Sequence, residues 1–171
     1  MVEFASRPAR FRWLWFAAVA ATLLLAALLP LNVLPRNYAG PDVLLALTRA
    51  WVIRKPEHLP FLVIAAVMLL ADLLLQRPPG LWAALVLLGS QVLRHRAEPL
   101  RDAGFGTELL FAALTILGVF AGYTLITALA FLPQPAASLS LSALAGTLLA
   151  YPACALSLRY AYSTRSEVDP E

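Results

Sequence analysis

The chain has 171 residues, of which 61% are hydrophobic and only 13% are charged, and its formal net charge is +3. Soluble domains carry roughly 25% charged residues, so this composition excludes an ordinary soluble protein and indicates one that lies mainly in lipid. The single cysteine, Cys154, excludes an internal disulfide. The basic residues stand in short clusters between apolar runs, which is typical of membrane topology and argues against a nucleic-acid partner.

Six apolar runs, separated by prolines and basic residues, predict an all-α polytopic membrane protein with six transmembrane helices. A signal peptide is the competing interpretation of the first run, but its apolar core would have only about 7–15 residues. The second run begins at Pro41 and must end near Lys55, because Pro56 follows. It is short for a bilayer, so a re-entrant segment is an alternative to a span. The expected helices cover residues 13–34, 41–55, 59–76, 81–94, 107–132 and 137–158, the last interrupted at Pro152.

Six spans place both termini on one side of the membrane, and the basic residues indicate which side this is. Two arginines, Arg36 and Arg77, fall on the opposite side, whereas ten basic residues share the side of the termini. Cytoplasmic loops carry an excess of Lys and Arg, so both termini are expected in the cytoplasm. We therefore expect a cytoplasmic segment 1–12, a transmembrane domain 13–158 and a cytoplasmic tail 159–171. The ten residues are Arg7, Arg10, Arg12, Arg54, Lys55, Arg94, Arg96, Arg101, Arg159 and Arg165.

Four polar residues in the second and third runs are the candidate functional site. Asp72 lies in the third run, and Gln76 follows it at the i+4 position on the same helical face. Arg49 shares a face of the second run with Asp42 and is the available partner for Asp72. A charge in a membrane span is costly unless it is paired, which predicts an intramembrane polar network. The alternative is that Arg49 and Asp72 extend to opposite membrane surfaces.

The remaining charged groups predict no catalytic or metal chemistry. Glu108 opens the fifth run, where the helix dipole and Arg101 favour a solvated residue at the membrane surface. His58 and His95 lie in predicted loops, and their spacing does not resemble a metal site. The sequence contains no HExxH, glycine-rich phosphate loop or GxSxG motif, and its longest loop has about a dozen residues. We therefore expect a protein that is not an enzyme and has no cofactor.

Small residues gather on two of the predicted helices. Gly118 and Gly122 form a GxxxG pair in the fifth run, and Gly146 belongs to a small-residue face of the sixth. Such faces let helix backbones approach closely in lipid. The pattern predicts close packing, either within the monomer or against a partner protein.

The stretch from residue 40 to residue 96 contains a series of motifs around its prolines. They are Gly40-Pro41-Asp42, Trp51, Arg54-Lys55-Pro56-Glu57, Pro60-Phe61, Ala71-Asp72-Leu73-Leu74 and Arg77-Pro78-Pro79-Gly80-Leu81-Trp82. Over this third of the chain, the sequence resembles the family of the rod shape-determining protein MreD. Elsewhere the likeness is generic: length, number of helices and cytoplasmic termini.

The resemblance implies a non-enzymatic inner-membrane subunit of the bacterial cell-elongation (Rod) complex, which maintains cell shape and lateral peptidoglycan synthesis. Its implied partners are MreC and, directly or indirectly, MreB and the RodA–transpeptidase pair, with a homodimer as an alternative assembly. The family is also similar in overall fold to the six-helix substrate-binding subunits of energy-coupling-factor transporters. A vitamin-type binding subunit is therefore the alternative function. A third interpretation is an intramembrane proton carrier that uses Asp72, which would require a second acid at similar depth.

Overall fold

The computed structural model describes residues 7–29, 39–56 and 59–166, and within these ranges the chain is entirely helical. The prediction of an all-α fold is therefore confirmed. The helices are α1 (Arg7–Leu28), α2 (Val43–Arg54), α3 (Phe61–Leu74), α4 (Leu81–His95), α5 (Ala97–Asp102), α6 (Phe105–Leu129) and α7 (Ala137–Ser166).

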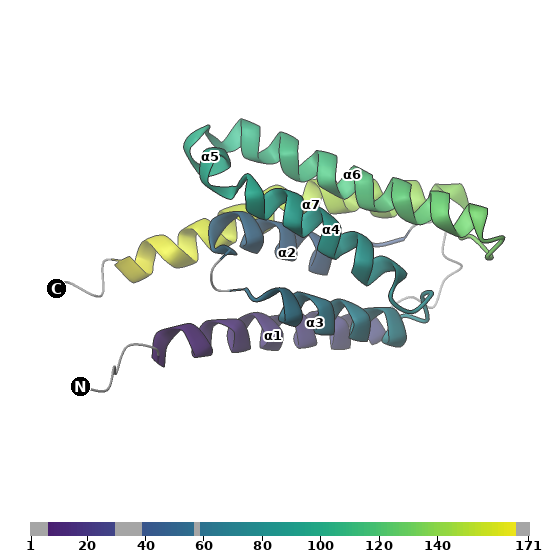
Figure 1. Ribbon diagram of the computed structural model, residues 1–171, viewed down its shortest axis with the longest axis horizontal. Helices are drawn as coiled ribbons and strands as arrows, with labels where there is room; N and C mark the ends of the chain where they lie inside the picture. Colours follow the sequence, from purple (N-terminus) through teal and green to yellow (C-terminus); the bar gives the residue numbers. More distant parts are fainter. Residues whose placement is uncertain (1–6, 30–38, 57–58, 167–171) are drawn as a thin grey trace.

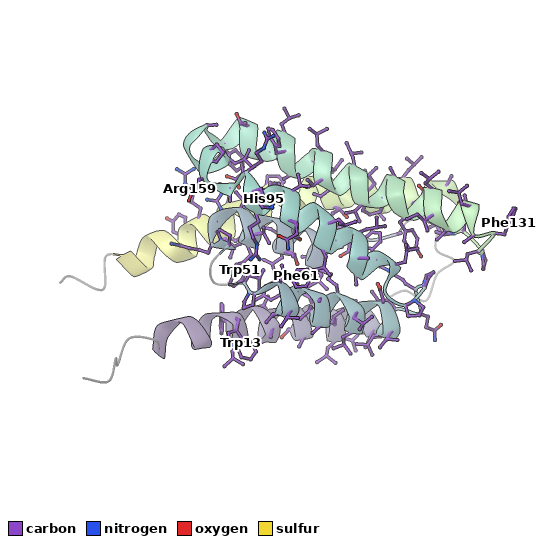
Figure 2. All side chains as sticks on the ribbon, in the orientation of Figure 1. Trp13, Trp51, Phe61, His95, Phe131 and Arg159 are labelled. Atoms are coloured by element: carbon purple, nitrogen blue, oxygen red, sulfur yellow. The ribbon has the colours of Figure 1, made fainter. Side chains whose placement is uncertain are left out.

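The helices other than α5 alternate in direction along a common axis (Figure 1). α1 and α3 lie side by side on one side of the bundle, α6 and α7 lie on the other, and α2 and α4 lie between them. The first turn of α1 and the last turn of α7 are at the same end, near Trp13 and Arg159, whereas Phe131 marks the opposite end (Figure 2). The structure therefore brings the two ends of the described chain to one end of the bundle, as the sequence predicted.

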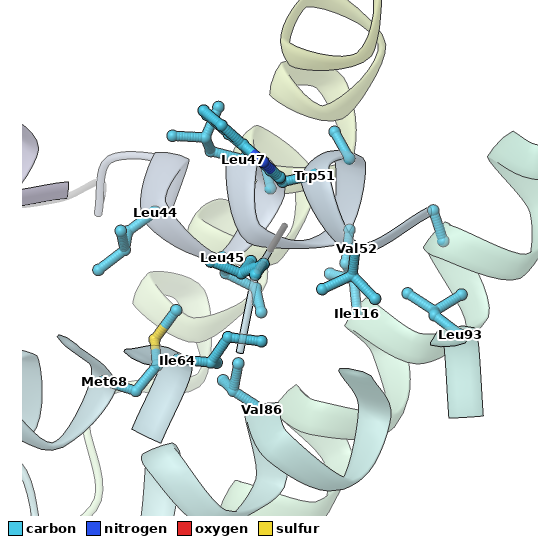
Figure 3. Packing of buried hydrophobic residues seen from close by; sticks show 14 of the residues in the cluster. Leu44, Leu45, Leu47, Trp51, Val52, Ile64, Met68, Val86, Leu93 and Ile116 are labelled. Carbon is cyan, nitrogen blue, oxygen red and sulfur yellow. The ribbon is translucent and has the colours of Figure 1, made fainter. Parts of the chain in front are cut away.

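α2 is the central helix, because every residue from Leu44 to Ile53 is buried. It contacts α1, α4, α5, α6 and α7. Its leucines and valine pack among side chains from α3, α4 and α6, such as Met68, Val86 and Ile116 (Figure 3). On another side, the ring of Trp51 meets that of Phe16 edge-on, with centroids 5.4 Å apart. A helix buried around its whole circumference fixes the positions of its neighbours.

The outer surface of the bundle is apolar. The helices α1, α3, α4, α6 and α7 all expose large aliphatic side chains, for example Leu25, Leu62, Leu88, Leu125 and Leu149. Polar residues are found in the interior instead: Thr48, Arg49, Asp72, Ser90, Glu108, Thr127 and Thr147 are all buried. The rest of the interior is apolar, so the bundle differs from a soluble protein in its apolar outer surface and in its buried charged residues, which are rare in soluble proteins.

Two helices are long and apolar enough to cross a membrane: α6, and α7 over Ala137–Tyr160. The apolar part of α1, Trp13–Leu28, and α3 are shorter. α2 has 12 residues, which corresponds to about 18 Å at 1.5 Å per residue, against a hydrocarbon core of about 30 Å. The fifth and sixth predicted spans are therefore long and apolar enough to cross a membrane, and the other four stay predictions.

Several helix boundaries differ from the predicted ones. α1 begins at Arg7, not at residue 13, and α2 begins at Val43 with Asp42 as its N-cap, not at Pro41. A short helix, α5, occupies part of the connection predicted as a loop, because Ala97 and Leu100 bury their side chains in the bundle. The far end of the first predicted helix, residues 30–34, and Arg36 lie outside the described residues.

α7 also departs from prediction, because it continues without interruption through Pro152 to Ser166. An interior proline removes one backbone hydrogen bond and costs a helix about 3 kcal/mol. Tyr151 and Ala155, on either side of it, are buried in the core and hold both halves of the helix in place. The predicted tail from residue 159 is consequently helical for its first half.

The predicted small-residue faces have different surroundings. A methyl group on Gly146 would lie 3.2 Å from Cβ and 3.3 Å from Cα of Pro41, and one on Gly122 would lie 3.0 Å from Cδ2 of Leu85. Around Gly118, such a group would meet nothing within 4 Å. Gly122 and Gly146 therefore pack within the chain, whereas Gly118 faces away from it.

We expect Gly146→Ala to lower the stability of the protein in detergent by about 1–3 kcal/mol, the usual cost of overpacking. The added methyl group would press on the rigid ring and backbone of Pro41, which cannot move aside as a flexible side chain can. Gly118→Ala is the matched control, and its melting temperature should be unchanged or slightly higher, because alanine favours helix. Equal melting temperatures for the two variants would contradict this difference in packing.

Candidate functional site

The first polar group of the site lies where α2 begins. Oδ1 of Asp42 accepts a hydrogen bond from the backbone N–H of Leu45 at 3.0 Å, which makes Asp42 the N-cap of α2. Its Oδ2 forms an ion pair with the guanidinium of Arg77, with distances of 3.3 Å and 3.2 Å to Nη1 and Nη2. The backbone N–H of Asp42 donates to Oγ1 of Thr147 at 2.8 Å. One residue thus joins α2, the turn between α3 and α4, and α7.

Arg77 is held from a second side by an aromatic cluster. Its guanidinium lies over the ring of Trp82, 4.5 Å from the ring centroid, in a cation–π contact. The rings of Phe120 and Tyr123 meet Trp82 edge-on at 5.2 Å and 5.3 Å. The cation therefore connects the start of α2 to α4 and, through the aromatic rings, to α6.

Asp72 is fully buried and caps α4 from a different helix. α4 begins after Gly80, whose φ of +84° suits glycine and which has no side chain to cap the helix. Oδ2 of Asp72 accepts from the backbone N–H groups of Gly80 and Ala83 at 3.0 Å and 3.1 Å. A carboxylate at a helix N-terminus satisfies otherwise unpaired N–H groups and is favoured by the helix dipole. Asp72 therefore fixes the angle between α3 and α4.

Arg49 lies further along α4, with its side chain 0% exposed. Its Nη1 donates to the backbone oxygen of Val86 and to Oγ of Ser90, both at 3.0 Å. The guanidinium lies against Gly89, where a methyl group would come within 2.5 Å of Nη2. The guanidinium therefore occupies space that a side chain would fill if position 89 were not glycine.

The structure brings together only part of the predicted network. Asp42 and Asp72 lie near one end of the bundle, but Arg49 bonds to α4 and not to Asp72, so the predicted pair is wrong. The reason is that the unpaired N–H groups of α4 bind Asp72, and Val86 and Ser90 lie further along that helix. Gln76 has an exposed side chain and a φ of +54°, outside the network. The alternative, in which Arg49 extends to a membrane surface, is excluded by its burial.

Sequence reasoning missed Arg77 as a member of this site. The sequence predicts only that it lies on the side of the membrane opposite the termini, whereas in the structure it is the partner of Asp42. The sequence contains an indication of this role. The Pro78-Pro79-Gly80 turn is too short to carry Arg77 far from the ends of the helices on either side.

A second polar cluster joins the other end of α2 to α6 and α7. Nη2 of Arg54 lies 3.0 Å and 3.1 Å from the two carboxylate oxygens of Glu108, and the hydroxyl of Tyr151 donates to Oε1 at 3.0 Å. Glu108 is only 6% exposed, so the prediction of a solvated surface residue is wrong. Its partner comes from a helix 54 residues earlier in the chain, not from the neighbouring loop.

The geometry of both clusters is that of helix capping and helix–helix attachment. In the part of the chain that the structure describes, His, Cys, Asp and Glu residues form no group of three or more that could hold a metal ion. Comparison with models of known protein families, with curated proteins and with solved structures found no match for this chain.

We expect Asp72→Ala to destabilise the protein in detergent by about 1–2 kcal/mol, the typical cost of losing an N-cap. Asp72→Asn should cost less, because its amide oxygen can still accept one or both N–H groups of α4. Thermal unfolding of the three proteins measures the difference. Equal losses in the two variants would show that the charge at the helix N-terminus matters more than the acceptor, and an unchanged Asp72→Ala protein would contradict the capping role.

Proposed function

We propose that this chain is a non-enzymatic, multi-pass subunit of the bacterial inner membrane that works in the cell-elongation complex, as members of the MreD family do. The observation that carries the proposal concerns the motifs in which the resemblance lies. Asp42, Asp72, Arg77, Gly80 and Trp82 all belong to them. In the structure they form one connected set of contacts, because the backbone N–H of Arg77, the partner of Asp42 and Trp82, donates to the backbone oxygen of Asp72 at 2.9 Å. These residues carry the likeness to the family, and they also fix the arrangement of α2, α3 and α4. Residues of this kind are expected to define a fold that the family shares.

The distribution of side chains supports a place in the membrane. Apolar residues cover the outside of the bundle, polar residues lie inside it, and α6 and α7 are long enough to span. The short α2 can lie within the membrane, because protein surrounds it and forms hydrogen bonds with the polar groups at its ends. It therefore needs no contact with lipid. On this proposal, all helices except α5 traverse part or all of the bilayer.

The basic residues support the proposed orientation. Arg54, Arg94 and Arg159 lie at or near the ends of α2, α4 and α7, and these three helices end where α1 begins. This end of the bundle faces the cytoplasm in the proposal, in keeping with the excess of basic residues on cytoplasmic loops.

The proposed partner is MreC, a bitopic protein whose single transmembrane helix can pack on an exposed apolar face of the bundle. MreB and the RodA–transpeptidase pair would be contacted directly or through MreC. Without a hydrophobic driving force between helices in lipid, such contacts depend on shape. A rigid bundle, held by internal ion pairs, is suited to present a constant surface of this kind.

The orientation is tested with alkaline phosphatase fusions, since the enzyme is active only outside the cytoplasm. A fusion after Glu171 should be inactive and a fusion at Pro135, between α6 and α7, should be active. Activity in the C-terminal fusion would rule out the proposed orientation.

The cellular role is tested in cells that lack the native protein. The unaltered chain should restore rod shape and retain MreC on purification. Arg77→Ala removes the ion pair with Asp42 and the contact with Trp82, and we expect it to restore neither, although it reaches the membrane. If the unaltered chain inserts normally but restores no shape and retains no MreC, the proposed function is wrong.

A further inference from the structure

The guanidinium of Arg49 has hydrogen-bond partners on one side only. Nη1 donates to Val86 and Ser90, whereas Nε and Nη2, both buried, have no partner. These two nitrogens form the side edge of the guanidinium, where two N–H groups point in parallel. That edge matches the two oxygens of a carboxylate or phosphate, the bidentate geometry that arginine forms most favourably.

Three other arginines of the bundle, Arg54, Arg77 and Arg94, differ from Arg49 in the partners of their guanidinium nitrogens. Arg54 and Arg94 also have a buried Nε without a partner, but Nη2 of Arg54 binds Glu108 and Nη2 of Arg94 binds the backbone oxygen of Leu59. Both terminal nitrogens of Arg77 bind Asp42. Among the described residues, Arg49 is the only arginine with both Nε and Nη2 buried and without a hydrogen-bond partner.

The charge of Arg49 is uncompensated for the same reason. The carboxylates of the two polar clusters bind other groups: Asp42 pairs with Arg77, Glu108 pairs with Arg54, and Asp72 caps α4 through its Oδ2. A neutral carbonyl and a hydroxyl are the partners that Arg49 has. A buried cation without a counter-charge is strongly unfavourable, so an anion placed at this edge would relieve a large cost.

The surroundings are built to hold the guanidinium in this place. Gly89 leaves the room that Nη2 occupies, and Ser90 orients Nη1 while donating its own hydroxyl proton to Val86 at 2.7 Å. The contacts with Gly89 and Ser90 thus fix the orientation of the Arg49 side chain, while its Nε and Nη2 donors remain without partners.

We propose that the Nε–Nη2 edge of Arg49 binds an oxyanion, a phosphate or carboxylate group held by two parallel hydrogen bonds between α2 and α4. The anion is either free in solution or the headgroup of an anionic lipid. Arg49 is shielded from solvent, so an anion reaches this edge only when the packing around α2 opens locally. The inference goes beyond the cell-elongation role and does not depend on it.

The test follows the side-chain Nε–H resonance of Arg49 by NMR, in the full-length protein labelled with ¹⁵N-arginine and purified in a neutral maltoside detergent. Inorganic phosphate is added at constant ionic strength against sodium chloride. In a second arm, a short-chain phosphatidic acid is compared with the uncharged diacylglycerol of the same chain length. We expect a saturable shift of this resonance with phosphate or with the phosphatidic acid.

Two variants make the test specific. Arg49→Lys identifies the resonance and lacks the fork, so its affinity for the same anion, followed by thermal stabilisation, should fall about tenfold or more. Arg94→Lys is the matched control, because Arg94 lacks the free edge, and it should leave the titration of Arg49 unchanged. If Arg49→Lys does not fold, Ser90→Ala identifies the resonance instead, because it removes one partner of Nη1.

The two arms distinguish the source of the anion. Saturation by inorganic phosphate indicates a free oxyanion, whereas a response to the phosphatidic acid alone indicates a lipid headgroup, and either supports the site. A shift that does not saturate in either arm, or equal thermal stabilisation of the Arg49→Lys variant, would overturn the proposal.

Discussion

An ion pair at each end of α2 is the constraint on which the rest of the bundle depends. Asp42 binds Arg77 where the helix begins, and Arg54 binds Glu108 where it ends. Three of these charges also lie at favourable helix termini: Asp42 at the N-cap of α2, Arg54 in its last turn and Glu108 in the first turn of α6. Each is therefore compensated by its partner and by a helix dipole, which makes it acceptable in an apolar environment.

These two attachments explain why a helix as short as α2 can occupy the centre. Both of its ends are attached to side chains, at the beginning to one from the α3–α4 turn and at the end to one from α6. A backbone end buried in protein must find its hydrogen bonds there, and the N-cap of Asp42 and the bond from Asp42 N–H to Thr147 provide them. The longer helices α6 and α7 can then form an outer layer whose exposed residues are apolar.

The sequence predicts the helices better than it predicts the contacts between them. Apolar runs and prolines locate each long helix to within several residues, because both report on local backbone preference. Which side chains meet depends on how each helix is rotated about its axis, and that is decided by packing. The sequence makes Arg49 the available partner of Asp72, yet the unpaired N–H groups at the start of α4 bind Asp72 instead. For the same reason, a GxxxG spacing did not reveal that Gly118 faces outward while Gly122 faces Leu85.

The carboxylates of the two polar clusters differ from the buried Arg49 in how their charges are balanced. Asp42, Asp72 and Glu108 each meet a cation or a helix N-terminus, so their burial adds rigidity at moderate cost. Arg49 is bonded only to a carbonyl and a hydroxyl, although the chain keeps Gly89 free of a side chain to accommodate it. If its role were only to join α2 to α4, an apolar side chain of similar size would serve with less desolvation cost. The proposed counter-anion would account for a charge at this contact, and α2 touches enough of the bundle for a change there to reach most of the other helices.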